Sequence, residues 1–186
     1  MKNIIVLFLC LLTACTTVGP IKPVTQSPEK INHWQANGSM SIRQANRTTA
    51  FSFEWQQNQR HYTLQLFAPL GLGSLRIVGS EDHVELWQSA SQKITAKTPE
   101  ILMQRELGYA VPITSLYYWV RGLPDPHWPM TKILSKQNHL VQLQQQGWKI
   151  NFLDFKIISG FDLPTQMILE DKNTRVKIVV TQWNLQ

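Results

Sequence analysis

The stretch AFSFEWQQNQRHYTLQL (residues 50–66) decides the fold, because apolar and polar side chains alternate in it on both sides of a polar turn. Alternation with a period of two places every second side chain on one face of a β-strand. Residues 56–59 are all glutamine or asparagine and separate the two alternating runs. The pattern therefore predicts an antiparallel hairpin with one apolar face. The apolar side chains of that face are Phe51, Phe53, Trp55, Tyr62, Leu64 and Leu66.

Similar short strand patterns continue along most of the chain. They begin near Trp34 and recur at residues 75–78, 84–87, 92–96, 140–143, 148–152, 166–169 and 175–180. Turn residues, such as Gly147 and the polar run at 170–173, separate neighbouring patterns. Many short antiparallel strands of this kind predict a mainly β (α+β) fold, an incomplete and strongly curved antiparallel β-barrel.

Helical patterns are few. Residues 98–108 begin with Thr98 at an N-cap position and Pro99 in the first turn, which favours a short helix that ends at Gly108. Residues 112–120 predict a second helix, and residues 27–34 a third. We expect two or three short helices to form a lid over one face of the sheet.

Helices this short cover one face of a curved sheet only incompletely, which leaves room for an apolar cavity between lid and sheet. The alternative is a tightly packed core without a hollow, and the pattern alone favours that alternative. A register error of one residue would also exchange the inner and outer faces. The residues predicted to line the cavity or the lid are Phe51, Phe53, Trp55, Leu64, Leu66, Leu75, Ile77, Leu116, Trp119, Ile150 and Phe152.

The N-terminus is typical of a secretory signal. Lys2 precedes an apolar run at residues 4–12 that is too short to span a bilayer as a helix. The following LTAC (residues 12–15) resembles the lipobox of bacterial lipoproteins, which predicts diacylglycerol and an N-acyl group on Cys15. The alternative is an ordinary signal followed by a chance cysteine.

These features divide the chain into a signal peptide (1–14), a lipidated flexible tether (15–30) and a folded domain (31–186). Thr16 stands where an aspartate commonly retains lipoproteins at the inner membrane, so outer-membrane anchoring on the periplasmic face is expected. The two cysteines are Cys10, within the signal, and Cys15. No thiol therefore remains in the domain for a disulfide.

Composition excludes several classes of protein. Hydrophobic residues make up 43% and charged residues 16% of the chain, which excludes disorder. The net charge is +6, but Lys and Arg are scattered, so nucleic-acid binding is not expected. The five histidines lack metal-site spacing and no G-x-S-x-G motif occurs, so we predict no metal, no cofactor and no enzyme activity. A lipid-modifying enzyme of another type stays an alternative.

The loop FAPLGLG (residues 67–73) breaks the rule that turns are polar, because it carries Leu70 and Leu72. Proline and glycine here permit a tight bend that holds apolar side chains outward. We interpret the loop as an apolar tip that enters a bilayer or a partner's groove. The alternative is that one leucine folds back into the core.

Taken in order, several motifs together resemble the LolB family of outer-membrane lipoprotein receptors over nearly the whole domain. No single motif is specific, but their order together with the lipobox is. They are Trp34-x-Ala36-x-Gly38, Phe53-x-Trp55, Pro69-Leu70-Gly71, Leu116-x-x-Trp119-Val120-x-Gly122-Leu123-Pro124, Gln146-Gly147 before Trp148, Leu163-Pro164, and Val176-Lys177-Ile178 followed by Trp183.

The resemblance implies an apolar cavity under a helical lid, in place of the packed core. It also implies a protein that accepts acylated lipoproteins from the periplasmic carrier LolA and inserts them into the outer membrane without a nucleotide. Nothing in the sequence points away from a monomer. Leu70 corresponds to the family's protruding leucine, which is linked to insertion into membrane lipid. Leu72 departs from the more polar residues expected there, which leaves the division of roles between the two leucines open. A scaffold lipoprotein that binds a protein partner through this loop remains the alternative.

Overall fold

The computed structural model describes residues 26–71, 73–80, 83–89, 92–136 and 139–186. Cys15, Leu72, the predicted signal and most of the predicted tether lie outside the described residues. At the end of the predicted tether, the Gln26 backbone N–H donates a hydrogen bond to the Gly160 carbonyl of the domain at 2.8 Å.

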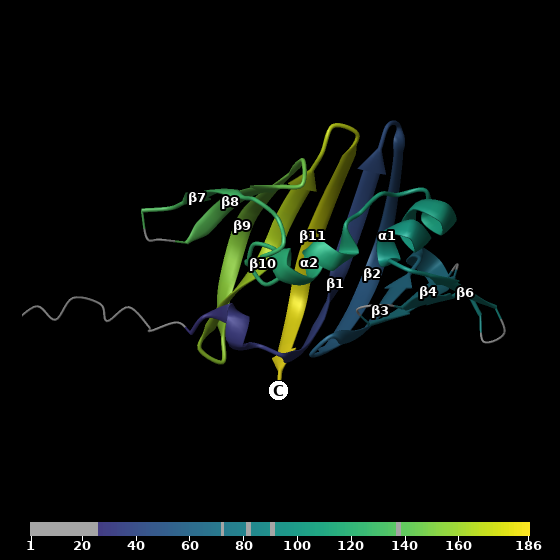
Figure 1. The fold of residues 1–186 in the computed structure, drawn as a ribbon, viewed down its shortest axis with the longest axis horizontal. Helices are drawn as coiled ribbons and strands as arrows, with labels where there is room; N and C mark the ends of the chain where they lie inside the picture. Colours follow the sequence, from purple (N-terminus) through teal and green to yellow (C-terminus); the bar gives the residue numbers. More distant parts are fainter. Residues whose placement is uncertain (1–25, 72, 81–82, 90–91, 137–138) are drawn as a thin grey trace, which may run out of the picture.

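Eleven strands formed by the described residues make one antiparallel sheet, in the order β6-β5-β4-β3-β2-β1-β11-β10-β9-β8-β7. Figure 1 shows this sheet curving around the short helices. The strands are β1 (His33–Gln44), β2 (Arg47–Asn58), β3 (His61–Phe67), β4 (Ser74–Gly79), β5 (Val84–Trp87), β6 (Lys93–Ala96), β7 (Thr131–Leu134), β8 (Leu140–Gln145), β9 (Trp148–Ile158), β10 (Phe161–Glu170) and β11 (Thr174–Leu185). The incomplete, strongly curved barrel predicted from the sequence is confirmed.

The predicted hairpin is formed by β2 and β3. Trp55 pairs with Leu64 and Phe53 pairs with Leu66, so the large apolar side chains lie side by side on one face. All four are buried. Cross-strand pairs of this kind fix the register, because a slip of one residue would turn the whole apolar row towards solvent.

The first and last strands of the chain lie together at the centre of the sheet. β1 pairs with β11 from Trp34↔Leu185 to Gln44↔Thr174, with one register shift after Asn37. Gly38 follows that shift, and a Cβ atom built on it would lie 2.0 Å from the Val179 carbonyl oxygen. The close approach of the two backbones therefore requires glycine at this position.

Two of the three predicted helices are present. The first comprises α1 (Pro99–Leu102) and a π-helical turn (Met103–Leu107), and the second is α2 (Ile113–Trp119). The Thr98 side chain accepts a hydrogen bond from the Ile101 N–H, as its N-cap position predicts. Gly108 then ends the first helix with a φ of 76°.

The third predicted helix, at residues 27–34, is wrong. Only a 3₁₀ turn (Pro28–Lys30) forms, and β1 already begins at His33. The reason is that Trp34 and Ala36 are buried with a period of two, between β2 and β11, which an extended backbone allows and a helix does not.

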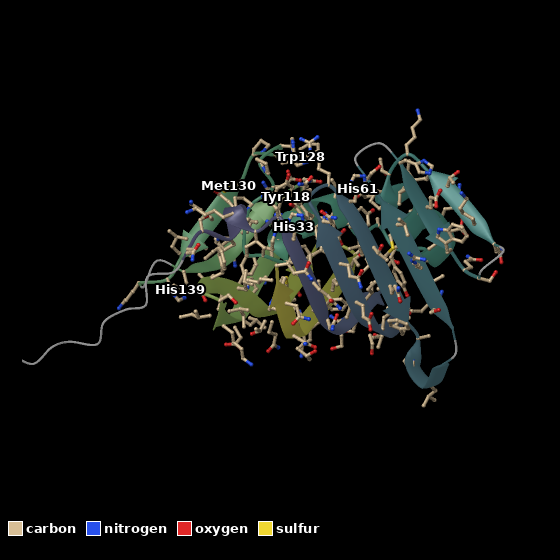
Figure 2. The ribbon with its side chains drawn as sticks, turned by 90° about the horizontal axis from the view of Figure 1, so that it is seen from below. His33, His61, Tyr118, Trp128, Met130 and His139 are labelled. Carbon is tan, nitrogen blue, oxygen red and sulfur yellow. The ribbon has the colours of Figure 1, made fainter. Side chains whose placement is uncertain are left out.

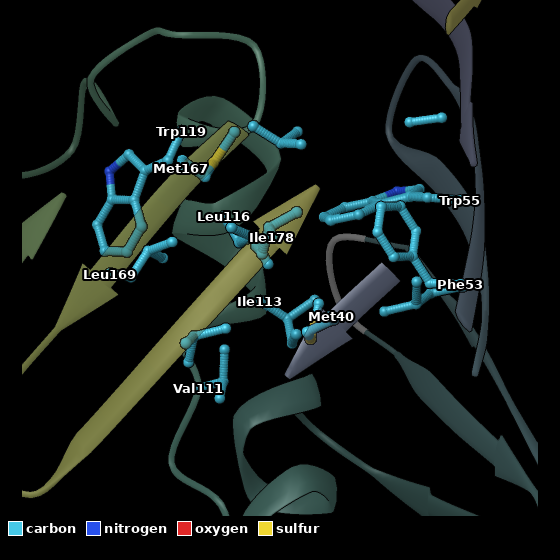
Figure 3. Packing of buried hydrophobic residues seen from close by; sticks show 14 of the residues in the cluster. Met40, Phe53, Trp55, Val111, Ile113, Leu116, Trp119, Met167, Leu169 and Ile178 are labelled. Carbon is cyan, nitrogen blue, oxygen red and sulfur yellow. The ribbon is translucent and has the colours of Figure 1, made fainter. Parts of the chain in front are cut away.

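The core lies between the inner face of the sheet and α2. Figure 3 shows Ile113, Leu116 and Trp119 of α2 among buried side chains of the sheet. Their sheet partners in this view include Met40, Met167 and Ile178, all buried. The apolar side chains of α2 therefore attach the lid to the middle of the curve.

Gly38→Ala tests the central strand pairing. We expect it to lower the free energy of unfolding by about 1–3 kcal/mol, because the added methyl group overpacks the β1–β11 contact. Urea denaturation measures the effect, and Ser39→Ala, at the exposed neighbouring position, is the control. Equal stability of the two variants would contradict the proposed close approach.

Candidate functional site

The residues predicted to line a cavity share one face of the molecule. All eleven lie on the inner face of the sheet or on α2; Leu75 is half-buried and the other ten are buried. Figure 3 shows Phe53, Trp55, Leu116 and Trp119 within this packed layer. The structure therefore brings the set together beneath the lid, but most of its members contact one another and not an open space.

An open hollow of about 710 Å³ lies at one end of this layer, between the sheet and α2. Its volume falls within the range of about 300–1,000 Å³ that is usual for sites of small ligands. Trp55 is the member of the predicted set that lines it, beside Ile113, Tyr117 and Tyr118 of the lid region. The hollow therefore has one aromatic wall from the sheet and another from α2.

Polar side chains surround the opening of the hollow. The exposed residues Gln59 and Arg60, between β2 and β3, and Lys97, before α1, contribute to its lining, and Gln57 of β2 lines it from a buried position. Figure 2 shows Tyr118 at this end of the molecule. A hollow with aromatic walls and with polar, partly cationic residues in the rest of its lining suits an amphipathic ligand, whose hydrocarbon part would lie against the rings.

The loop with Leu70 lies at the other end of β3 from this hollow. β3 begins at His61, beside the lining of the hollow, and ends at Phe67. At about 3.3 Å per residue, these two ends of the strand lie about 20 Å apart. Leu70 is 96% exposed and has a φ of 57°, in the left-handed region. A hydrogen bond from the Ala68 N–H to the Gly73 carbonyl, 2.9 Å, closes the loop. The loop thus holds the Leu70 side chain in solvent, away from the hollow.

Gln145 of β8 fixes the segment that follows α2. Its Oε1 accepts from the Trp119 indole N–H at 2.8 Å and from the Asp125 backbone N–H at 3.0 Å. Its Nε2 donates to the carbonyls of Asp125 and Trp128 at 2.7 and 2.9 Å. One buried amide therefore satisfies four polar groups and holds the C-terminal end of the lid on the sheet.

Arg121 makes a second clamp at the same end of α2. The guanidinium is buried, donates to the carbonyl oxygens of Pro28 and Ile31 at 3.3 and 3.0 Å, and lies 4.2 Å from the centre of the Tyr117 ring. Burial lowers the pKa of this guanidinium from its ordinary value. Sequence reasoning missed both clamps. For Arg121 the signal was a charged residue in the otherwise apolar run at the end of α2 and just after it, residues 119–124.

Ser115, Asp125 and His127 form a cluster that has the composition of a hydrolase triad but not its geometry. The Ser115 hydroxyl donates to Asp125 at 2.6 Å, and the His127 imidazole contacts the other oxygen of Asp125 at 2.8 Å. The carboxylate thus stands between the hydroxyl and the imidazole, whereas nucleophilic catalysis needs the imidazole in the middle. The cluster stabilises the segment after α2.

Among the described residues, no group of three His, Cys, Asp or Glu side chains is arranged to hold a metal ion.

Known proteins share this fold and much of this sequence. The family model for the outer membrane lipoprotein LolB matches residues 32–183. The chain belongs to the LolB family. It is 38% identical to the outer-membrane lipoprotein LolB of Coxiella burnetii over 83% of this chain and 73% of that protein. It is 34% identical to LolB of Francisella tularensis strain WY96-3418, over 84% and 76% of the two chains.

Solved structures share the fold of this LolB-family chain at low sequence identity. A DUF1329 family protein from Desulfovibrio piger has a TM-score of 0.59 and 9% identity, with 86% of this chain and 88% of that chain covered. A LolA superfamily protein from Nitrosomonas europaea has a TM-score of 0.57 and 10% identity, with 84% and 87% covered. The family places the chain among outer-membrane lipoproteins, and the described part of it has no helix long and apolar enough to cross a bilayer.

Gln145→Leu tests whether one amide holds the lid. We expect the free energy of unfolding to fall by about 2–4 kcal/mol, since each buried polar group left without a partner costs about 1–3 kcal/mol. The exposed neighbour Gln144, changed to Leu, should alter stability by no more than about 0.5 kcal/mol. Urea denaturation of both variants is the measurement, and equal small effects would show that Gln145 does not fix the lid.

Proposed function

We propose that this LolB-family protein accepts acylated lipoproteins from the periplasmic carrier LolA, buries their acyl chains and inserts them into the outer membrane without a nucleotide. The observation that carries the proposal is the aromatic-walled hollow of about 710 Å³ between the curved sheet and α2. The scaffold alternative, in which only the apolar loop binds a partner, gives no reason for such a hollow.

The physical need for a shielded route comes from the cargo. Each methylene exposed to water costs about 0.8 kcal/mol, so two or three acyl chains together cost tens of kcal/mol. A carrier that keeps the chains in an apolar environment removes this barrier. Transfer then proceeds downhill if this protein binds the chains more tightly than the carrier and the membrane binds them more tightly still. No chemical step and no cofactor is required, so the protein acts as a receptor and not as an enzyme.

Movement of the lid supplies the remaining room for the chains. Beneath α2 the sheet presents a continuous layer of buried apolar side chains next to the hollow, among them Phe53, Leu66 and Ile150. When α2 shifts away from this layer, the hollow extends into it and the residues predicted from the sequence become lining residues. The clamps at Gln145 and Arg121 hold the C-terminal end of α2, so we expect the N-terminal end of the lid to move.

The carrier, the lipoprotein cargo and outer-membrane lipid are the proposed partners, and the protein acts as a monomer. The tether is anchored by diacylglycerol and an N-acyl group on Cys15. Leu70 acts at the last step, when the chains leave for the bilayer. Its exposed side chain contributes roughly 1.5–3 kcal/mol on burial in lipid, which biases a docked encounter without anchoring the protein.

Leu70→Glu separates acceptance from delivery. The side chain is exposed, so the variant should fold and take lipoprotein from the carrier as before, but a carboxylate at the tip should prevent insertion into lipid. Transfer of a labelled lipoprotein from carrier to receptor and from receptor to membrane vesicles measures the two steps. Leu70→Met, which keeps an apolar tip, is the control.

Loss of acceptance by Leu70→Glu with normal folding would contradict the role assigned to Leu70. Normal delivery by the same variant would contradict it as well.

Cys15→Ala tests the anchor and the binding of cargo together. We expect the secreted variant to appear in the soluble periplasmic fraction, because the lipid attached at Cys15 is the proposed anchor. Mass spectrometry of the purified variant should detect bound acylated lipoprotein. Sedimentation with outer membranes would contradict the anchor, and recovery without any acylated ligand would contradict the receptor function.

A further inference from the structure

The ring of Tyr62 forms part of the wall of the hollow, in a space that exists because the facing residue of the next strand has no side chain. It lies on β3 opposite Gly79 of β4. A Cβ atom at position 79 would lie 2.4–2.5 Å from the ring and hydroxyl of Tyr62, so only glycine admits the ring there. The ring is therefore seated over the Gly79 backbone, 6.3 Å from the ring of Trp55.

The hydroxyl of Tyr62 is buried without a hydrogen-bond partner. In the described part of the chain, only the Trp34 indole N–H shares this condition among buried side-chain polar atoms. Trp55, beside it in the same wall, has its indole N–H satisfied by Gln57 Oε1 at 3.0 Å. A buried hydroxyl without a partner destabilises the free protein, which is a reason to look for a ligand group that completes it.

The surroundings define the group that would fit. The rings of Tyr62 and Trp55 form the wall of the hollow at this point, which favours an apolar part of a ligand, and the hydroxyl is a donor once it is uncovered. Burial, followed by the charge of Glu100, raises the pKa of Tyr62 far above its usual range, so the hydroxyl keeps its proton. The same negative charge disfavours a carboxylate or a phosphate at the hydroxyl itself, although the cations Arg60 and Lys97 also line the hollow. A neutral carbonyl oxygen joined to hydrocarbon meets all these conditions.

We propose, on the basis of the receptor function above, that the Tyr62 hydroxyl, which is inaccessible in the empty protein, is uncovered when the lid moves and then donates a hydrogen bond to an ester carbonyl of the cargo's diacylglyceryl group. The contact marks the point where the acyl chains join the glycerol. The chains then extend inward beneath α2, and the lipoprotein's peptide leaves past the exposed lining residues Gln59, Arg60 and Lys97. Phospholipids carry the same ester, so the test includes them as a second source of this group.

The experiment compares three probes on the full protein and on Tyr62→Phe. The first is an S-dipalmitoylglyceryl-cysteine peptide, the second its dihexadecyl ether analogue without the ester carbonyls, and the third dipalmitoylphosphatidylglycerol. We expect Tyr62→Phe to weaken binding of the ester lipopeptide about 3- to 10-fold, the contribution of one hydrogen bond, and to leave the ether analogue unchanged. A similar loss with the phospholipid would support recognition of the ester itself.

Stability supplies an independent readout with a matched control. Tyr62→Phe removes an unpaired buried hydroxyl, so the ligand-free variant should melt about 2–4 °C higher than the parent protein. Tyr109→Phe makes the same chemical change, but the Tyr109 hydroxyl is hydrogen-bonded to Thr49 and lies outside the hollow. It should lower the melting temperature and leave ester binding unchanged.

Three outcomes would overturn the assignment of Tyr62. They are equal losses for the ester and ether probes, no loss for either, and a loss confined to the phospholipid. Binding of the lipopeptides by the parent protein in any of these cases keeps the proposed receptor function intact. Failure of the parent protein to bind either lipopeptide would instead overturn both the receptor function and the inference that depends on it.

Discussion

The backbone contact between β1 and β11 at Gly38 is the constraint on which the rest of the structure depends. It joins the first and last strands at the centre of one sheet. At position 38 only a hydrogen atom, and no side chain, fits in front of the Val179 carbonyl oxygen. Each half of the chain then adds its strands outward by hairpins, and the sheet ends in two separate edges, β6 and β7. A sheet built this way curves without closing, and the short segment α2 is left to cover the inner face.

Incomplete cover is also the basis of the proposed function. The buried clamps at Gln145 and Arg121 bind the end of α2 firmly, whereas the wall at the opposite side of the hollow carries the unpaired hydroxyl of Tyr62. One end of the lid is thus stabilised by satisfied polar groups and the hollow retains an unsatisfied one. Such an arrangement favours a protein that is stable when empty and gains a further hydrogen bond when filled.

The sequence permitted prediction of the elements whose side chains alternate regularly. The β2–β3 hairpin, the helix capped by Thr98 and the shared face of Phe53, Trp55 and Leu116 follow from local patterns. The β1–β11 pairing and the hollow depend on contacts between distant residues, which no local pattern contains. β7 was missed because all four of its residues are exposed, and the predicted helix at 27–34 was wrong because Trp34 belongs to a strand that its neighbours define. The periodicity of the sequence favoured a packed core, and only the resemblance to the LolB family predicted a hollow. The roles of Cys15 and Leu70 are predictions.

The central claim is that cargo acyl chains lie between α2 and the inner face of the sheet. Photo-crosslinking tests it most directly: a photoreactive phenylalanine at Tyr117, in the hollow, is compared with one at the exposed Leu153 of β9 while the protein holds a lipoprotein received from its carrier. We expect position 117 to become attached to the acyl chains and position 153 to stay unmodified. Attachment at position 153 with none at position 117 would contradict it.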